Sequence, residues 1–122
     1  MASEGLHEPA ELLDEATIDR HRAFVSLIEE LEAIDWYDQR IVATNDDELA
    51  AVLAHNRDDE KEHAAMALEW IRRRDPAFDE QLRTYLFSDG PIRSQEDDAG
   101  AGEDGEMTSA HDLGIGSLKE AS

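Results

Sequence analysis

The sequence predicts an all-α protein, built as an antiparallel two-helix hairpin followed by a short third helix. Apolar residues recur at helical spacing over residues 10–43 and again over 46–74. Neither range contains glycine or proline, and no segment alternates with the period of a β-strand. A hairpin of two long helices leaves one apolar side open. We therefore expect a second copy of the chain to complete a four-helix bundle.

Local signals mark the ends of the two long helices. Pro9 suits a first helical position, so the first helix is expected over residues 10–43. The break at residues 44–48 is rich in capping residues, and Asn45 with Glu48 three positions later resembles a capping pair. The second helix is expected over residues 46–74, with three arginines in its last turn where the helix dipole favours positive charge.

A short third helix is expected over residues 77–87. The Asp75–Pro76 pair ends the helix before it, because the residue preceding a proline disfavours helical backbone. The third helix carries four apolar or aromatic side chains, and the Asp-Gly-Pro sequence at residues 89–91 stops it.

Charge and composition exclude several classes of function. The 122 residues carry 11 Lys or Arg against 31 Asp or Glu, a formal charge of −20 at pH 7, and a single domain is expected at this length. Nucleic acids and anionic membranes need a basic face, so neither is an expected partner. The absence of cysteine excludes disulfides, thiolate zinc sites and thiol catalysis. No apolar run approaches about 18 residues and no signal-peptide stretch is visible, so we expect a soluble cytoplasmic protein.

The end of the chain differs in composition from the helical part. Residues 94–122 hold eight acids and one base, and residues 94–112 contain no aromatic residue, Leu, Ile or Val. Such a segment cannot bury enough surface to offset its ordering entropy. We therefore predict a helical domain over residues 1–93, a disordered acidic linker over 94–112, and a distinct segment over 113–122 in which three aliphatic residues return.

Three ionisable residues interrupt the apolar stripes of the long helices. Glu30 lies within a stripe that runs from Leu27 to Ile41, and Glu60 and His63 share one face of the second helix because they are three residues apart. Burying a carboxylate without a compensating charge is very costly, so facing stripes with these groups favour a metal ion. The alternative is a solvated Glu60 paired with Lys61 or an arginine, and spacing alone weighs the two about equally.

The ligand pattern is half of a known set. Di-iron helical bundles take a Glu from each of two helices and a Glu-x-x-His motif from each of two others. One copy of this chain supplies one of each, so two copies would supply four carboxylates and two imidazoles. These donors suit iron or manganese better than copper. The ligand count and the open apolar side therefore predict the same dimer independently.

A second group of residues lies beside the first. Glu29, Glu32 and Trp36 share a face rotated away from Glu30, and carboxylates three residues apart can hold a hard cation weakly. Two solvated surface carboxylates are the alternative. Tyr37, on the same face as Glu30, is placed to donate a hydrogen bond to a ligand carboxylate.

Several segments together resemble the encapsulated ferritins. These are residues 29–40 (EELEAIDWYDQR), 55–66 (HNRDDEKEHAAM), 68–73 (LEWIRR) and 83–87 (RTYLF). The resemblance spans about residues 6–92, and it continues at the C-terminus, where Leu-Gly-Ile-Gly-Ser-Leu-Lys looks like the cargo-loading peptide that docks such proteins inside encapsulin shells. That peptide comprises Leu113, Gly114, Ile115, Gly116, Ser117, Leu118 and Lys119. Asp59 stands where relatives commonly have Glu.

The resemblance implies a ferritin-like fold and a ferroxidase. By motif position, Glu30, Glu60 and His63 would ligate a di-iron centre between two chains, with Tyr37 nearby. Glu29 and Glu32, near Trp36, would match an uptake site leading iron to that centre. The family's dimers form an annular decamer, which cannot itself hold a mineral. Storage would then take place in the enclosing encapsulin nanocompartment of the cytoplasm, with Ca or Mn as candidates for secondary sites.

Two other interpretations stay open on the sequence alone. One is a non-catalytic, dimeric metal-binding adaptor or cargo protein that the C-terminal segment presents to a partner. The other is a salt-adapted acidic helical protein, which the scarcity of lysine supports, since only Lys61 and Lys119 occur. Salt adaptation does not explain a carboxylate inside an apolar stripe.

Overall fold

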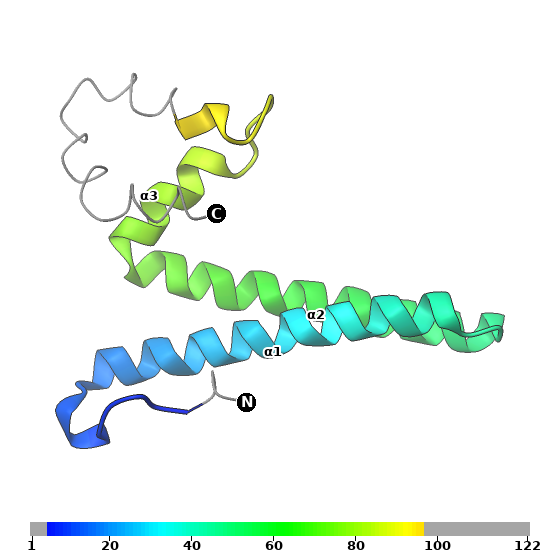
Figure 1. Cartoon of the computed structure of the whole chain (residues 1–122), viewed down its shortest axis with the longest axis horizontal. Coiled ribbons are helices and arrows are strands. Elements are labelled where there is room, and N and C mark those ends of the chain that lie inside the picture. The colour runs from blue at the N-terminus through cyan, green and yellow to red at the C-terminus, as the bar shows by residue number, and fades with distance from the viewer. Residues whose placement is uncertain (1–4, 97–122) are drawn as a thin grey trace. The chain divides into compact units, whose positions relative to one another are not determined.

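The computed structural model describes residues 5–96, and these residues are helical without any strand (Figure 1). The fold is therefore all-α, as the periodicity predicts. No helix in this range is long and apolar enough to cross a membrane. The elements in chain order are the 3₁₀ turn η2 (Ala10–Leu12) and the helices α1 (Glu15–Ala43), α2 (Asp47–Arg74) and α3 (Pro76–Tyr85).

Helix α1 begins later than the sequence predicts. The Asp14 side chain accepts a 2.8 Å hydrogen bond from the backbone N–H of Thr17 and so caps the helix. A capping residue needs extended backbone, which Asp14 adopts, as does Leu13 before it. The helix predicted from residue 10 is thus interrupted: Pro9 precedes only a single 3₁₀ turn, and the continuous helix starts at Glu15.

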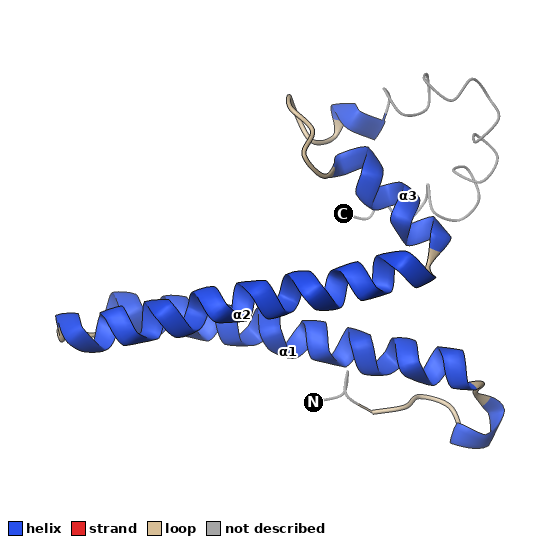
Figure 2. Ribbon diagram, turned by 180° about the vertical axis from the view of Figure 1, so that it is seen from behind, coloured by secondary structure: helices blue, strands red, loops and turns tan. Residues whose placement is uncertain are grey.

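A short turn connects α1 to α2 and makes them antiparallel. Asp46 caps α2, because its carboxylate accepts hydrogen bonds from the N–H groups of Glu48 and Leu49 at 2.9 and 3.1 Å. The predicted Asn45–Glu48 capping pair is therefore wrong by one position. Thr44 supports the turn by accepting a 3.1 Å hydrogen bond from the N–H of Asp46. The two helices pack against each other along the hairpin (Figure 2).

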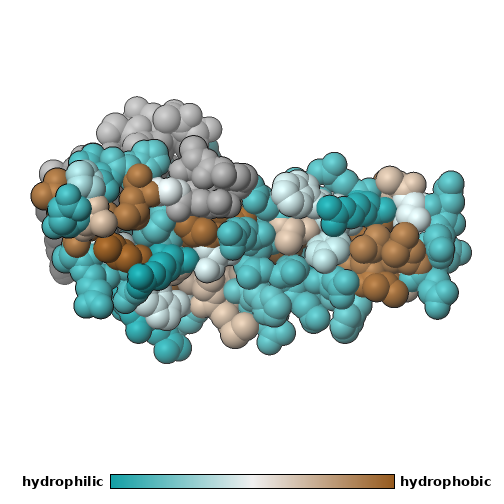
Figure 3. All heavy atoms as spheres, turned by 90° about the horizontal axis from the view of Figure 1, so that it is seen from below, coloured by the Kyte–Doolittle hydropathy of each residue, from teal (hydrophilic) through white to brown (hydrophobic). Residues whose placement is uncertain are grey.

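The hairpin has almost no interior of its own. Among the described residues only Ala64 and Ile71 are buried, at 8% and 0% exposure. Large apolar side chains stay open to solvent, and hydrophobic patches alternate with hydrophilic ones on the face shown in Figure 3. The exposed residues on α1 and α2 are Phe24, Leu31, Trp36, Val42, Leu49, Val52 and Met66. A single copy therefore leaves large apolar side chains of both long helices uncovered, and the stripe from Leu27 to Ile41 is only half-buried.

Residues 76–96 belong to a second compact unit, separate from the hairpin. Helix α3 starts at Pro76 and is supported by an ion pair of 2.9 Å between Arg83 Nε and Asp79 Oδ1. It ends at Tyr85, two residues before the predicted end. Phe87 adopts a left-handed backbone with φ 62°, which cannot continue an α-helix.

The predicted linker and cargo-loading peptide lie outside the described residues, apart from residues 94–96. The domain boundaries at residues 93 and 112 stay predictions.

Candidate metal centre

Helix α2 brings Glu60 and His63 together by its own geometry. Residues three apart lie on the same side of a helix. The imidazole Nδ1 of His63 lies 3.1 Å from Glu60 Oε1, within hydrogen-bonding distance. The sequence prediction that these two side chains project together is confirmed.

Glu30 completes the group from the opposite helix. Its Oε1 lies 3.8 Å from His63 Nδ1, and one ligand atom from each of Glu30, Glu60 and His63 lies within 4.8 Å of the other two. Donor atoms that bind a single first-row metal at about 2.0–2.2 Å are at most roughly 4.4 Å apart. Small side-chain movements are therefore enough for all three to reach one ion. This is the only such group of three that residues 5–96 form.

The electrostatics of the group show that it is short of positive charge. A hydrogen bond to Glu60, together with partial burial, raises the pKa of Glu30. The hydrogen bonds from Glu30 and His63 lower the pKa of Glu60. The hydrogen bond between His63 and Glu60 raises the pKa of His63. The contact with Glu60 thus disfavours the charged form of Glu30 and favours the positive form of His63. A divalent cation would relieve the repulsion between the carboxylates, and the oxygen and imidazole donors fit iron or manganese.

The site is open on one side. The side chains of Glu30 and Glu60 are 27% and 25% exposed, and that of His63 is 48% exposed. A two-metal centre in a helical bundle normally has ligands from four helices that point inward. The two helices of one chain leave the outer half of this group facing solvent.

The neighbouring residues singled out in the sequence do not join this group. Glu29 is exposed, Glu32 is half-buried, and Trp36 is 50% exposed. Their role as an uptake site stays a prediction.

The half-buried Tyr37 ring lies under the guanidinium of Arg40, whose Cζ is 5.7 Å from the ring centroid. It donates no hydrogen bond to a ligand carboxylate within the described single chain. Its role beside the centre formed by two copies stays a prediction.

An ion pair near the group was not found from the sequence. Arg57 of α2 donates a 2.9 Å hydrogen bond from Nη1 to Asp38 Oδ1 of α1 and a 3.2 Å hydrogen bond from Nε to Asp58 Oδ1. Only 25% of the Arg57 side chain is exposed. The sequence gives no simple signal for it, because Asp38 is five residues before the end of α1 whereas Arg57 is ten residues after the start of α2.

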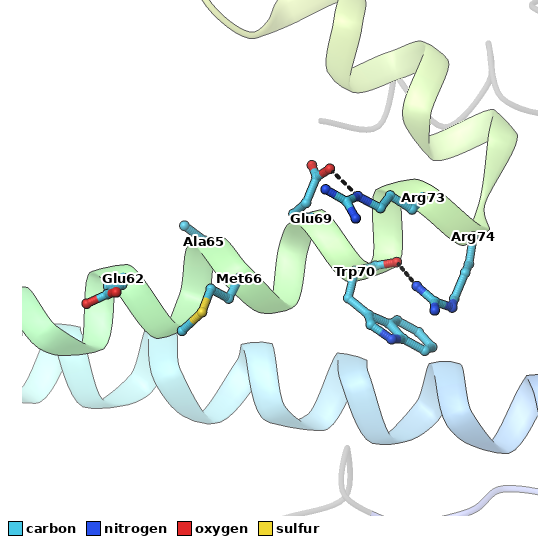
Figure 4. A pocket seen from close by; sticks show the side chains of 7 residues that line it. All are labelled: Glu62, Ala65, Met66, Glu69, Trp70, Arg73 and Arg74. Carbon is cyan, nitrogen blue, oxygen red and sulfur yellow. Dashed lines mark hydrogen bonds and ion pairs between the residues drawn. The ribbon is translucent and has the colours of Figure 1, made fainter.

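A hollow along the C-terminal half of α2 contains no ligand of this group (Figure 4). Trp70 lines it, and the Cζ atom of Arg74 lies 4.0 Å from the centroid of the Trp70 ring. Glu69 lines it too, but its carboxylate is already paired with Arg72 and Arg73. Here the protein's own cations neutralise the carboxylate, unlike Glu30 and Glu60.

Known proteins resemble the chain over most of its length. An encapsulated ferritin-like protein of Rhodospirillum rubrum is 59% identical over 126 residues, covering 97% of this chain and 90% of the relative. A crystal structure of a Nitrosomonas europaea protein matches with a TM-score of 0.71 and 62% identity, covering 72% of this chain and 97% of the other. An encapsulin nanocompartment cargo protein of Myxococcus xanthus is 47% identical over 47 residues, covering 38% of this chain and 36% of the relative.

The sequence profile of the EncFtn-like family matches residues 5–89, which include both long helices, all three members of the Glu30, Glu60 and His63 group, and α3. The match covers well over half of the chain. The chain therefore belongs to the EncFtn-like family of encapsulated ferritin-like proteins.

Proposed function

We propose that the protein is a ferroxidase, which oxidises Fe(II) to Fe(III) at a two-metal centre formed between two copies of the chain. The observation that carries this proposal is the convergence of Glu30, Glu60 and His63 from two helices, with one donor atom of each within 4.8 Å of the others. Iron is the substrate of the reaction, and the three side chains are the groups that bind it.

Two features support completion of the centre by a second copy. The ligands of one chain amount to half of the donors that a di-iron bundle uses. In addition, only Ala64 and Ile71 are buried in the hairpin, so a single copy lacks the core that holds a bundle together. A second hairpin laid against the open side would cover the apolar stripes and bring the other half of the ligands.

The residues contribute charge and position to the reaction. Glu30 and Glu60 bind the cations through carboxylate oxygens, and their negative charge favours Fe(III) over Fe(II). His63 binds as the neutral imidazole and releases its proton when the metal enters. Two Fe(II) ions give up one electron each. These two electrons and two protons reduce one dioxygen to hydrogen peroxide or, where peroxide is the oxidant, one hydrogen peroxide to two waters. Open coordination positions at the irons let the oxidant approach.

Association with an encapsulin shell forms the second half of the proposal. The relatives from Rhodospirillum and Myxococcus are named as encapsulated and as a nanocompartment cargo protein. We propose that residues 113–119 dock this chain inside such a shell in the cytoplasm, and that the acidic segment 94–112 gives the peptide its reach. Oxidised iron would then be stored in the shell, with the dimers arranged as an annular decamer.

The test replaces Glu30 by Gln in the full chain and measures Fe(II) oxidation by stopped-flow absorbance. E30Q removes the charge of one ligand while keeping its size, so the rate should fall by about 100-fold or more, beyond what loss of a partner outside the ligand shell costs. Asp35→Asn is the matched control, because it removes one charge from the same helix at an exposed residue that bonds only to Gln39. Its rate should equal that of the wild type.

Metal stoichiometry gives a second measurement of the same proposal. The wild-type assembly should bind one iron per chain at this centre, which is two per pair, and E30Q should lose both. Oxidation by E30Q at the wild-type rate contradicts the ligand assignment. Tight metal binding by the wild type without oxidation above the buffer background would instead favour the non-catalytic metal-binding cargo protein.

A further inference from the structure

We propose that the Asp38–Arg57 ion pair is a positioning element of the metal site, holding α1 and α2 in the register at which Glu30 faces Glu60 and His63. The inference deepens the proposed function and concerns this same site. Neither residue binds metal in the proposal. They act by fixing where one helix lies along the other.

The pair lies between the metal site and the turn of the hairpin. Asp38 is eight residues after Glu30, roughly 12 Å along α1, and Arg57 is three residues before Glu60, roughly 4.5 Å along α2. The distance between Arg57 Nη1 and Asp38 Oδ1 is 2.9 Å, and it spans the gap between the helices. The two residues therefore differ by roughly 7.5 Å in their position along the hairpin, and the Arg57 side chain spans this difference. A slide of one helix along the other would change the length of that span and would displace Glu30 by the same amount.

Little else fixes the register in this part of the hairpin. The buried residues Ala64 and Ile71 both lie on the other side of the site from the turn. From residue 31 to residue 63 every side chain is half-buried or exposed. Half-exposed apolar contacts are not directional, so they tolerate small slides. A charge-assisted hydrogen bond is directional, so this contact depends on the positions of both helices.

The surroundings of Arg57 hold its side chain in one orientation. Its Nε donates to Asp58 Oδ1 of the same helix at 3.2 Å while Nη1 reaches across to Asp38. The guanidinium is thus held by two carboxylates, and only 25% of the Arg57 side chain is exposed. Both carboxylates raise the pKa of Arg57, so the group stays charged. A lysine at this position has no planar fork with which to hold both partners.

Loss of negative charge is the competing explanation for any effect of changing Asp38. Asp35 distinguishes a loss of charge from a loss of the contact between the helices. It lies closer to Glu30 along the same helix, and its side chain pairs within α1, with Gln39 at 3.2 Å. Asp35→Ala and Asp38→Ala therefore remove the same charge from the same helix. Only the second breaks a contact between the helices.

The experiment uses the full chain and Co(II), whose visible absorption reports its coordination and which stands in for Fe(II) without being oxidised. Asp38→Ala should weaken Co(II) binding roughly tenfold, the lower end of the loss seen for partners outside the ligand shell, and change the intensity of the absorption bands. Asp35→Ala should bind like the wild type. Asp38→Glu, which keeps a carboxylate able to reach Arg57, should recover most of the lost affinity.

A second variant covers the case in which Asp38→Ala does not fold, as judged by helical circular dichroism. Arg57→Lys keeps the charge and loses the two-pronged contact, so Co(II) affinity should fall by about threefold or more. The inference is overturned if Asp38→Ala binds Co(II) with the affinity and spectrum of the wild type. If Asp38→Ala does not fold, the same result in Arg57→Lys overturns it. An equal loss in Asp35→Ala overturns it too, because the effect would then come from charge alone.

The Co(II) readout separates this inference from the proposed function. If the wild type binds Co(II) but does not oxidise Fe(II), the ferroxidase proposal fails, while a changed spectrum in Asp38→Ala still supports the positioning role. If the wild type oxidises Fe(II) and Asp38→Ala behaves identically, the ferroxidase proposal stands and the positioning role fails. A wild type that binds no Co(II) contradicts both.

Discussion

The carboxylates of Glu30 and Glu60 face one another from two helices, although like charges at this distance repel. Each carboxylate affects the other: the contact with Glu60 raises the pKa of Glu30, and the hydrogen bonds from Glu30 and His63 lower the pKa of Glu60. Glu69 is the contrasting case on the same helix α2. Two arginines neutralise it completely, which leaves no demand for a further cation. The difference in local charge, and not the presence of a carboxylate, makes the group of Glu30, Glu60 and His63 the candidate metal site.

The Glu69 cluster gives a prediction about stability in acid. Its carboxylate accepts 2.7 Å hydrogen bonds from Nε of Arg72 and of Arg73, and these lower the pKa of Glu69 to about 2. Because the folded pKa lies below the unfolded value, the stabilisation is complete above about pH 4.5 and is lost as the pH falls toward 2. Glu69→Gln should therefore lower the thermal midpoint at pH 7 by a small amount and have no effect at pH 2.

Thermal unfolding of Glu69→Gln and wild type at several pH values tests this prediction. The cluster is exposed to solvent, so salt should also shrink the difference at pH 7. Glu80→Gln on α3 is a control for a generic loss of one negative charge. A difference between wild type and Glu69→Gln that is the same at pH 2 and pH 7 would contradict the assigned pairing.

At the scale of the elements, the ends of the helices are set by single side chains. The carboxylate of Asp14 starts α1, and the carboxylate of Asp46 starts α2. The second cap has a larger effect on the site, because it determines how tightly the chain reverses and therefore which residues of α1 and α2 face each other. Glu30 meets His63 only because the turn between the helices has this length.

Asp46→Ala should destabilise the protein by about 1 kcal/mol, because two N–H groups at the start of α2 would lose their acceptor. Asn45→Ala is the matched control, since Asn45 precedes the cap and its side chain does not cap α2. Chemical denaturation of both variants measures the difference. Equal losses, or a larger loss in Asn45→Ala, would restore the capping pair that the sequence suggested.

At the scale of the whole molecule, a single chain is incomplete in both packing and chemistry. Among the described residues the hairpin buries only two, and it carries the three candidate metal ligands on an open side. Both shortages would be met by the same event, the association of a second hairpin. An open assembly of this kind cannot enclose a mineral, which is why the proposed function includes a shell.

Deleting residues 113–122 should separate the two parts of that function. The deletion leaves α1, α2 and the group of Glu30, Glu60 and His63 untouched, so Fe(II) oxidation in solution should stay at the wild-type rate. Co-purification with an encapsulin shell protein produced in the same cells should be lost. A matched deletion of ten residues from the acidic segment 94–112 should keep co-purification, because it shortens the reach but leaves the docking peptide intact. Undiminished co-purification without residues 113–122 would contradict the docking role.

The prediction from the sequence was accurate where a local rule decides the structure. The long helices, the turn between them and the pairing of Glu60 with His63 follow from periodicity and from three-residue spacing. The errors occurred at ends and at contacts. The start of α1 moved to Glu15 because Asp14 competes for the backbone as a cap. The Asp38–Arg57 contact was missed because it depends on the register of two helices, which periodicity does not specify.

The sequence by itself determined the helical class, the faces on which the ligands lie and the acidic character of the chain, since each depends on residues within a few positions of one another. Only the tertiary structure decided that Glu30 stands opposite His63, that an arginine joins the helices beside them, and that nearly every apolar side chain stays partly exposed. These are relations between segments distant in sequence. The length of the turn decides which residues of the two helices face each other, and the small buried area of a single hairpin leaves its apolar side chains partly exposed.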